Sequence, residues 1–104
     1  MARSDLTEKI KLAIAEVEPG AEVVLYGSRA RGDETSGSDW DVLIITASRL
    51  ARERRELLRR RLYEIEWATG EVISAIISCR EEWDRPVHRL TPFYRNVEQE
   101  GVHL

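Results

Sequence analysis

The fold of this chain is decided by residues 22–45, which read EVVLYGSRARGDETSGSDWDVLII. The first five of them, residues 22–26, are dense in β-forming side chains and predict a short buried strand. Gly27 ends that strand, and the polar residues 33–38 have strong turn chemistry. A second strand is expected over residues 39–45, where an apolar run follows two aspartates. The two strands are therefore expected to be neighbours, joined by a polar loop.

Two aspartates, Asp39 and Asp41, open the second strand with one residue between them. Alternation along a strand places both on one face and Trp40 on the other. Mg²⁺ prefers carboxylate oxygens, usually one or two from the protein together with substrate phosphates. Two unpaired carboxylates on a half-buried strand also repel each other, and a bound cation removes that repulsion. The spacing predicts metal ligands at Asp39 and Asp41, and a solvated acidic loop end is the alternative.

The turn between the two strands predicts a phosphate site. Gly27 allows the backbone to approach a ligand closely, and a helix start presents unpaired N–H groups that favour an anion. We expect Ser28 to cap a short helical turn that Gly32 breaks. The Ser28 hydroxyl and the guanidinium groups of Arg29 and Arg31 are further donors for a triphosphate. An ordinary turn is the alternative, because a Gly-Ser pair alone is weak evidence.

The rest of the chain predicts helices around a third strand. In chain order, we expect a helix capped by Asp5 and stopped at Pro19-Gly20, a long helix over residues 50–68, a strand over residues 71–78, and a short helix from Thr91 to Gly101. Strands and helices in this order are typical of an α/β (α+β) domain, with a small mixed sheet of at least three strands and helices packed on it.

Size and composition point to one small folded domain. The chain has 104 residues, which fits a single domain over residues 1–104. Hydrophobic residues make up 42% of it, and the formal net charge is −3, so no overall basic character attracts nucleic acid or a membrane surface. The first residues lack the apolar segment of a signal peptide, and Cys79 is the only cysteine. We therefore expect a cytoplasmic protein without a membrane span.

Two motifs carry a resemblance to a known family. Residues 27–32 (GSRARG) and residues 38–44 (SDWDVLI) together resemble the signature of the DNA polymerase β-like nucleotidyltransferase superfamily. Within it, the chain is most similar to the minimal nucleotidyltransferases, which are often paired with a HEPN-domain protein. The resemblance implies a nucleotidyltransferase-like fold and Mg²⁺-dependent transfer of a nucleotidyl group from ATP or another NTP, with AMP from ATP as the expected reaction.

The resemblance also implies roles for individual residues. The triphosphate would be held by Gly27, Ser28, Arg29, Arg31 and Ser38. Asp39 and Asp41 would be catalytic and would bind the metal, with room for a two-metal site in which the two ions stabilise the attacking and leaving oxygens.

One expected residue is absent from the pattern. Such enzymes usually place a third carboxylate on a later strand, and Ser74 stands about where that acid is expected. Glu71 is the nearest acid and is our candidate for the third catalytic carboxylate, although its parity along the strand is opposite to that of Ser74. The absence of an aspartate inside residues 71–78 leaves catalytic competence open.

Two functions therefore remain. The first is an enzyme that transfers a nucleotidyl group to a hydroxyl acceptor. The sequence leaves the acceptor open, and a partner protein of a toxin–antitoxin pair is one candidate for supplying it or the rest of its site; the resemblance implies a HEPN-type partner. The second is a catalytically weak or inactive nucleotide-binding antitoxin or interaction module. A homo-oligomer is left open by the sequence, and a membrane partner is not expected.

Other charged and aromatic side chains have structural interpretations. Residues 49–61 contain seven arginines, but glutamates interleave with them and pairs such as Glu56 and Arg60 stand four apart. We expect a solvated, self-paired helix face, with RNA or an acidic partner as the weaker alternative. The aromatic residues expected to pack in the core, with a protein interface as the alternative for some, are Trp67, Trp83, Phe93 and Tyr94.

Overall fold

The computed structural model describes residues 3–35 and 37–104 of the chain. Its elements in chain order are α1 (Arg3–Val17), β1 (Glu22–Tyr26), α2 (Ser28–Arg31), β2 (Trp40–Thr46), α3 (Arg52–Thr69), β3 (Ile73–Cys79), α4 (Arg80–Trp83), α5 (Pro86–Arg89), α6 (Pro92–Glu100) and β4 (Val102–His103). The order confirms the predicted mixture of strands and helices, and β1 has the predicted bounds.

The four strands form one mixed sheet in the order β3-β2-β1-β4. β1 and β2 are antiparallel neighbours, as predicted, and the register places Tyr26 opposite Asp41. β2 and β3 are parallel, with α3 as the crossover between them, and Asp41 lies beside Ser74. β2 is thus a central strand, and the aspartate end of it lies between the end of β1 and the start of β3.

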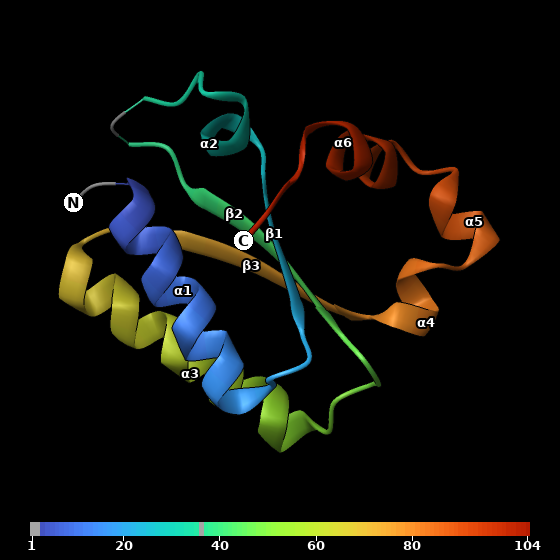
Figure 1. Ribbon diagram of the computed structural model, residues 1–104, viewed down its shortest axis with the longest axis horizontal. Coiled ribbons are helices and arrows are strands. Elements are labelled where there is room, and N and C mark those ends of the chain that lie inside the picture. The colour runs from blue at the N-terminus through green and yellow to red at the C-terminus, as the bar shows by residue number, and fades with distance from the viewer. Residues whose placement is uncertain (1–2, 36) are drawn as a thin grey trace.

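One face of the sheet is covered by α1 and α3 (Figure 1). The core on this side joins side chains of both helices to alternate residues of β1 and β2, and its largest member is Trp40, which is only 2% exposed. The buried residues of this helix-covered core are Leu6, Ile10, Ile14, Val17, Val23, Leu25, Trp40, Val42, Ile44, Leu58, Leu62 and Ile73. The apolar spacing of α1 and α3 predicted this packing.

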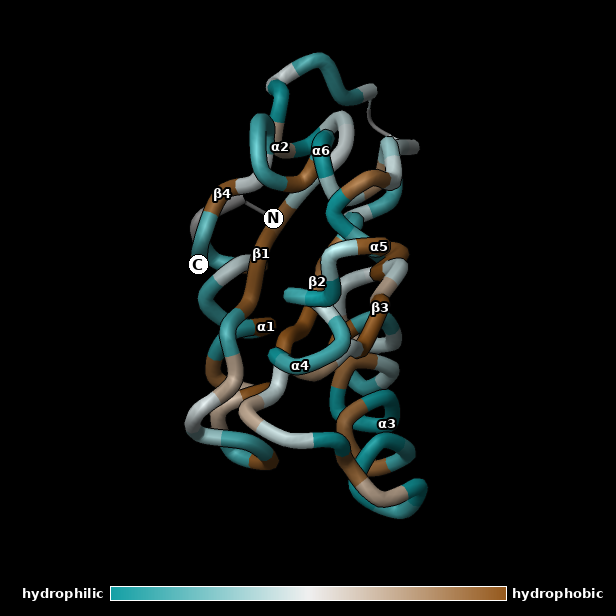
Figure 2. The backbone as a smooth tube through the Cα atoms, turned by 90° about the vertical axis from the view of Figure 1, so that its right-hand side faces the viewer, coloured by the Kyte–Doolittle hydropathy of each residue, from teal (hydrophilic) through white to brown (hydrophobic). Residues whose placement is uncertain are grey.

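The opposite face carries a second, smaller core beneath α4 and α6. Here Leu43 and Ile45 of β2 pack with Val24, Trp83 and Val97. The strands run between the two helical layers, as Figure 1 shows, and the hydropathy of the backbone in Figure 2 marks β1 and β2 as apolar and the loop beyond α2 as hydrophilic. Residues of β2 therefore alternate between two cores, and Asp41 shares its face with Leu43.

Several details differ from the sequence prediction. Helix α1 already includes Arg3, so Asp5 lies in its first turn and does not cap it. The N-cap of α2 is Gly27 and not Ser28, whereas Gly32 ends the helix in a left-handed conformation as expected. Thr91 caps α6 as predicted, since its side chain accepts a hydrogen bond from the Tyr94 N–H. Three elements were not predicted because they are too short to leave a periodic pattern, namely the helices α4 and α5 and the strand β4.

The aromatic and charged side chains divide between packing and solvent. Trp83 packs with Phe93 and Tyr94 as expected, but Trp67 is 80% exposed, so its predicted core position is wrong. The α3 arginines form several ion pairs, including Arg52–Glu56 within the helix and Arg54–Glu18 to the end of α1. Within residues 3–35 and 37–104, no helix has the length and apolar character that crossing a membrane requires.

The second core gives a direct test of this packing. Leu43 is fully buried under α4 and α6, whereas Leu12 lies exposed on α1. We expect Leu43→Ala to lower the free energy of unfolding by about 2–5 kcal/mol, because the change leaves a cavity in a close-packed site. The control Leu12→Ala should change it by no more than about 0.5 kcal/mol. Urea denaturation measures both, and equal effects would contradict the described packing.

Candidate functional site

The candidate site is the edge of the sheet where β1 ends and β2 begins. Gly27 follows β1 directly, and its Cα lies against the Asp41 side chain, so that a Cβ at Gly27 would overlap the Asp41 Oδ2 atom. The backbone of Gly27 has φ 75° and ψ −158°, a conformation that is essentially restricted to glycine. Glycine is therefore required at position 27 for two reasons, namely its backbone angles and the space that the Asp41 carboxylate occupies.

The turn after Gly27 presents backbone donors near this carboxylate. The Gly27 carbonyl accepts hydrogen bonds from the N–H groups of Ala30 and Arg31, which sets α2 directly behind the turn. The N–H groups of Ser28 and Arg29 precede the first bond of this helical turn, as at every helix start. The structure thus brings Gly27 against Asp41, with Ser28 next in the chain, and phosphate binding by this turn stays a prediction.

The two aspartates are close enough to influence each other. Burial raises the pKa of the Asp41 carboxyl, and the negative charge of Asp39 raises it further, while the positive charge of Arg31 opposes this rise. Burial also raises the pKa of the Tyr26 hydroxyl, with a further contribution from the charge of Asp41. The carboxylates of Asp39 and Asp41 are the hard oxygen donors that Mg²⁺ prefers, and a bound cation would offset the repulsion that Asp39 exerts on Asp41.

The neighbouring strand adds a hydroxyl and not an acid. Ser74 lies beside Asp41 in the parallel register, so its side chain shares the aspartate face. Within residues 3–35 and 37–104, no group of three or more His, Cys, Asp or Glu side chains is placed to hold a metal ion. Asp39 and Asp41 could hold one divalent cation together with phosphate oxygens, which fits the one or two protein carboxylates usual for Mg²⁺.

Glu71, the candidate third carboxylate, lies elsewhere. Its carboxylate accepts a hydrogen bond from Trp40 Nε1 at 3.1 Å and lies 3.7 Å from the guanidinium of Arg29. Trp40 belongs to the helix-covered core, on the opposite face of β2 from Asp41. The structure therefore does not bring Glu71 to the aspartates, and its catalytic role stays a prediction.

The predicted phosphate ligands are also divided. Arg31 is exposed beside the site, where it binds Asp33 and reaches Glu100 of α6 at 3.2 Å. Arg29 points to the other side, donates to the main-chain oxygen of Ser38 at 3.0 Å, and lies with Cζ 4.4 Å from the ring centroid of Trp40. Arg31 is thus available to a ligand at the aspartates, whereas Arg29 is held inside the protein.

The polar groups of Ser38 are hydrogen-bonded within the loop that ends at this residue. Its Oγ accepts a hydrogen bond from the Thr35 N–H at 2.9 Å, and its own N–H donates to the Thr35 carbonyl at 3.0 Å. Ser38 therefore shapes the turn directly before Asp39, and a direct contact of Ser38 with a nucleotide stays a prediction.

Sequence reasoning overlooked Tyr26. It is the cross-strand partner of Asp41, and its ring packs edge-on against Phe93 of α6, with the ring centroids 5.3 Å apart. The signal was available, because a residue that lies opposite Asp41 in an antiparallel pair of strands must share its face. Tyr26 connects the aspartate site to the layer formed by α4 and α6.

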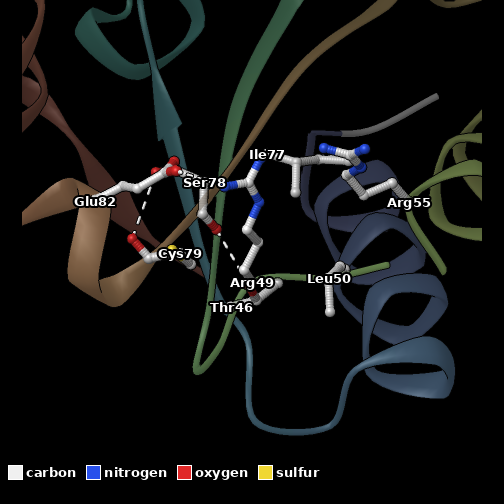
Figure 3. Close-up of a pocket in the computed structure, with 8 residues that line it drawn as sticks. All are labelled: Thr46, Arg49, Leu50, Arg55, Ile77, Ser78, Cys79 and Glu82. Carbon is white, nitrogen blue, oxygen red and sulfur yellow. Dashed lines mark hydrogen bonds and ion pairs between the residues drawn. The ribbon is translucent and has the colours of Figure 1, made fainter. Parts of the chain in front are cut away.

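A pocket at the opposite end of β2 is a poorer candidate. It has a volume of about 70 Å³ and is shown in Figure 3, lined by Thr46, Arg49, Leu50, Arg55, Ile77, Ser78, Cys79 and Glu82. Three of its polar side chains already have partners: Thr46 Oγ1 donates to the carbonyls of Ser48 and Ser78, and Arg49 pairs with Glu82 at 4.0 Å. We therefore assign the candidate site to the aspartate end of the strand.

Comparison with known proteins identifies the family and the fold of this chain. The family model described as "Nucleotidyltransferase domain" matches residues 7–101. No curated protein matches the chain. Among solved structures, a toxin–antitoxin crystallised with AMP-PNP has 19% identity and a TM-score of 0.62, over 92% of this chain and 69% of that one.

Two mutants of the toxin–antitoxin MntA–HpeT are similar to the same degree. One, with two aspartates changed to glutamate, has 18% identity and a TM-score of 0.62 over 92% of this chain and 69% of that one. The other has 21% identity and a TM-score of 0.64 over 94% and 70%. At these identities the likeness shows that the fold is shared.

The contact between Gly27 and Asp41 can be tested with a matched pair of glycines. Gly27 and Gly32 both have positive φ, but a Cβ at Gly32 would meet nothing within 4 Å. We expect both Gly27→Ala and Gly32→Ala to lower the free energy of unfolding, by about 1–3 kcal/mol. Only Gly27→Ala should also raise the Kd for Mg²⁺–ATP, by at least about tenfold, because it displaces the carboxylate. Calorimetric titration measures the Kd, and an equal change in both variants would refute the idea.

The raised pKa of Asp41 gives a second test. Between the ordinary aspartate pKa of 3.8 and the higher folded value, the folded protein binds more protons than the unfolded chain, so stability falls as the pH rises through that window. At neutral pH the full penalty remains. We expect Asp41→Asn to raise the melting temperature at about pH 7, with the gain disappearing below the ordinary value. Asp5→Asn, an exposed control on α1, should show no gain, and a lower melting temperature for Asp41→Asn would contradict this account.

Proposed function

This chain belongs to the nucleotidyltransferase domain family, and from that premise we propose that it transfers a nucleotidyl group, AMP from ATP, to a hydroxyl acceptor with the help of Mg²⁺. The observation that carries the proposal is the contact between Gly27 and Asp41, because it joins a phosphate-binding turn to a metal-binding carboxylate. A bulkier residue at either place would separate the two.

Each residue of the site has a role in this proposal. The turn at Gly27 and Ser28 binds the triphosphate through backbone N–H groups and the serine hydroxyl. Asp39 and Asp41 hold the cation, and Arg31 faces the phosphates with a positive charge. A bound Mg²⁺ supplies charge stabilisation to the phosphoryl oxygens. The protein residues orient the α-phosphate for in-line attack by the acceptor, with pyrophosphate as the leaving group.

We propose that the acceptor hydroxyl belongs to a partner protein. The three similar solved structures described above are toxin–antitoxin proteins, and one of them was crystallised with AMP-PNP, a nucleotide analogue. This likeness supports a toxin–antitoxin pair in which this chain modifies its partner, and the family resemblance suggests a HEPN-type partner. A cytoplasmic location fits a chain whose one cysteine, Cys79, is a free and buried thiol.

The proposal is tested first by binding. We expect ATP with Mg²⁺, at about a hundred times its Kd, to raise the melting temperature by roughly 10 °C or more, because a ligand that binds only the folded state stabilises it. ATP with a chelator should give a much smaller shift. The double variant Asp39→Asn, Asp41→Asn should lose the metal-dependent part.

Transfer is tested with ATP labelled in the α-phosphate and a candidate partner protein. We expect label on the partner, and the double variant should reduce the rate at least about a thousandfold, the scale of several kcal/mol of lost charge stabilisation. If no combination of partner and nucleotide yields label while the binding shift is present, transfer is refuted and nucleotide binding stands.

One observation favours a second candidate function, a nucleotide-binding antitoxin without transfer. Ser74 occupies the place beside Asp41 where a third acid would complete the metal site. On this alternative, the double aspartate variant still binds and neutralises its partner. On the primary proposal the variant binds its partner but no longer neutralises it, so a toxicity assay in the presence of the variant separates the two.

A further inference from the structure

We propose that Arg29, Trp40 and Glu71 form a positioning brace that holds Asp39 in its metal-binding orientation. The proposal rests on the metal–nucleotide site described above and assigns it three supporting residues. None of the three touches a ligand in this assignment. They act through the backbone on either side of Asp39.

Asp39 lies just outside the strand pairing, and the main-chain bond nearest to it joins the Trp40 N–H to the Val72 carbonyl at 2.8 Å. The ladder with β3 begins at Trp40, which pairs with Ile73, and Asp39 lies one residue before the strand. Asp41, by contrast, is held between Tyr26 and Ser74. The orientation of Asp39 is therefore set by its two chain neighbours.

A single guanidinium contacts both of those neighbours. Arg29 donates from Nη2 to the main-chain oxygen of Ser38 at 3.0 Å, directly before Asp39. The same group lies over the ring of Trp40, directly after Asp39, with Cζ 4.4 Å from the ring centroid. Such a cation–π contact is stronger where water is excluded, and the Arg29 side chain is only 12% exposed. The guanidinium thus clamps the peptide segment that carries the aspartate.

Glu71 completes the brace from the start of the third strand. Its Oε2 atom accepts from Trp40 Nε1 at 3.1 Å and lies 3.7 Å from Nη2 of Arg29. The indole ring is thereby fixed in its plane, and the partly buried Arg29 has a counter-charge. The three side chains form a closed set of contacts, on the side of the sheet opposite to Asp41.

The two possible roles of Arg29, a brace and a direct phosphate contact, can be distinguished by substitution. A phosphate accepts the point charge of lysine as well as the fork of arginine, but a lysine cannot both stack on Trp40 and donate to Ser38 from a planar group. A carboxylate that supports a metal site indirectly also behaves differently from one that acts in the reaction. Supporting partners of metal ligands typically change metal affinity or activity by 10–100-fold.

The test compares variants of Arg29 by calorimetric titration with Mg²⁺–ATP, Mg²⁺ being in excess. We expect Arg29→Ala and Arg29→Lys both to raise the Kd, by about 10–100-fold. Arg52→Ala is the matched control, because Arg52 is exposed and pairs only with Glu56 among the contacts described, and it should leave the Kd unchanged. If Arg29→Lys keeps the wild-type Kd while Arg29→Ala does not, Arg29 contacts the phosphates and the brace is refuted.

Glu71 is tested with two substitutions. Glu71→Gln retains an oxygen acceptor for the Trp40 indole, so we expect the Kd and the transfer rate to stay within about threefold of wild type, whereas Glu71→Ala should raise the Kd about tenfold. Glu56→Gln is the exposed control and should change neither quantity. A Glu71→Gln variant that binds Mg²⁺–ATP normally but loses transfer about a thousandfold would show a catalytic carboxylate and overturn the assignment.

Melting temperatures distinguish positioning from plain stability. Substitution of a residue that only stabilises the fold lowers the melting temperature of the free protein and leaves the Kd for Mg²⁺–ATP unchanged. That outcome would also overturn the brace. Should Arg29→Ala fail to fold, Trp40→Phe removes the indole donor but keeps an aromatic ring under Arg29, and it is expected to raise the Kd. Wild-type protein that does not bind Mg²⁺–ATP would refute the proposed function itself, and the brace with it. Normal binding by both wild type and variants would refute the brace alone.

Discussion

The pairing of β1 with β2 is the constraint on which the rest of the structure depends. Its antiparallel register sets Tyr26 opposite Asp41, so the chain leaves β1 through Gly27 at the carboxylate itself. The absence of a side chain at Gly27 is what lets a turn with free backbone donors and a strand with acidic side chains share one edge. The helices, by covering both faces of the sheet, keep these two strands in register.

Because side chains alternate along β2, Asp41 and the core residue Trp40 lie on opposite faces of the sheet. Asp41 lies on a face where it meets Tyr26 and Ser74, whereas Trp40 is buried on the other face among side chains of α1 and α3. The same strand thus carries a charged side chain, Asp41, and is anchored in the core by the residue before it, Trp40. The separation also keeps Glu71, which binds the Trp40 indole, away from Asp41 although both are acidic residues near the same edge.

Short-range pattern was sufficient for much of this fold. The bounds of β1, the neighbouring strands, the opposite faces of Asp41 and Trp40, and the Thr91 cap all follow from periodicity and turn chemistry within a few residues. The match of the family to residues 7–101 agrees with the resemblance carried by the two motifs. Elements with only a few residues, such as β4, leave no such pattern.

The interior contacts of Arg29 and Glu71 could not be predicted in the same way. An arginine after a Gly-Ser turn looks the same in sequence whether it faces a phosphate or the protein. What decides is the position of the Trp40 ring, and that ring is oriented by a residue 31 positions later in the chain. The exposure of Trp67 could not be predicted for the same reason. Its position on α3 follows from the sequence, but whether another element packs against it depends on the three-dimensional arrangement.

The position of α4 and α6 has a consequence for how the chain folds. Residues 22–79 contain β1, β2, α3 and β3, whose pairings join segments close in sequence and close only modest loops. The face of β2 with Leu43 and Ile45 receives its cover only from residues 80–100, which a ribosome makes later. Until that cover arrives, an emerging chain exposes an apolar surface on the strand that carries Asp41, and such surfaces promote association between chains. The last quarter of the sequence thus protects the nascent protein as well as completing the folded one.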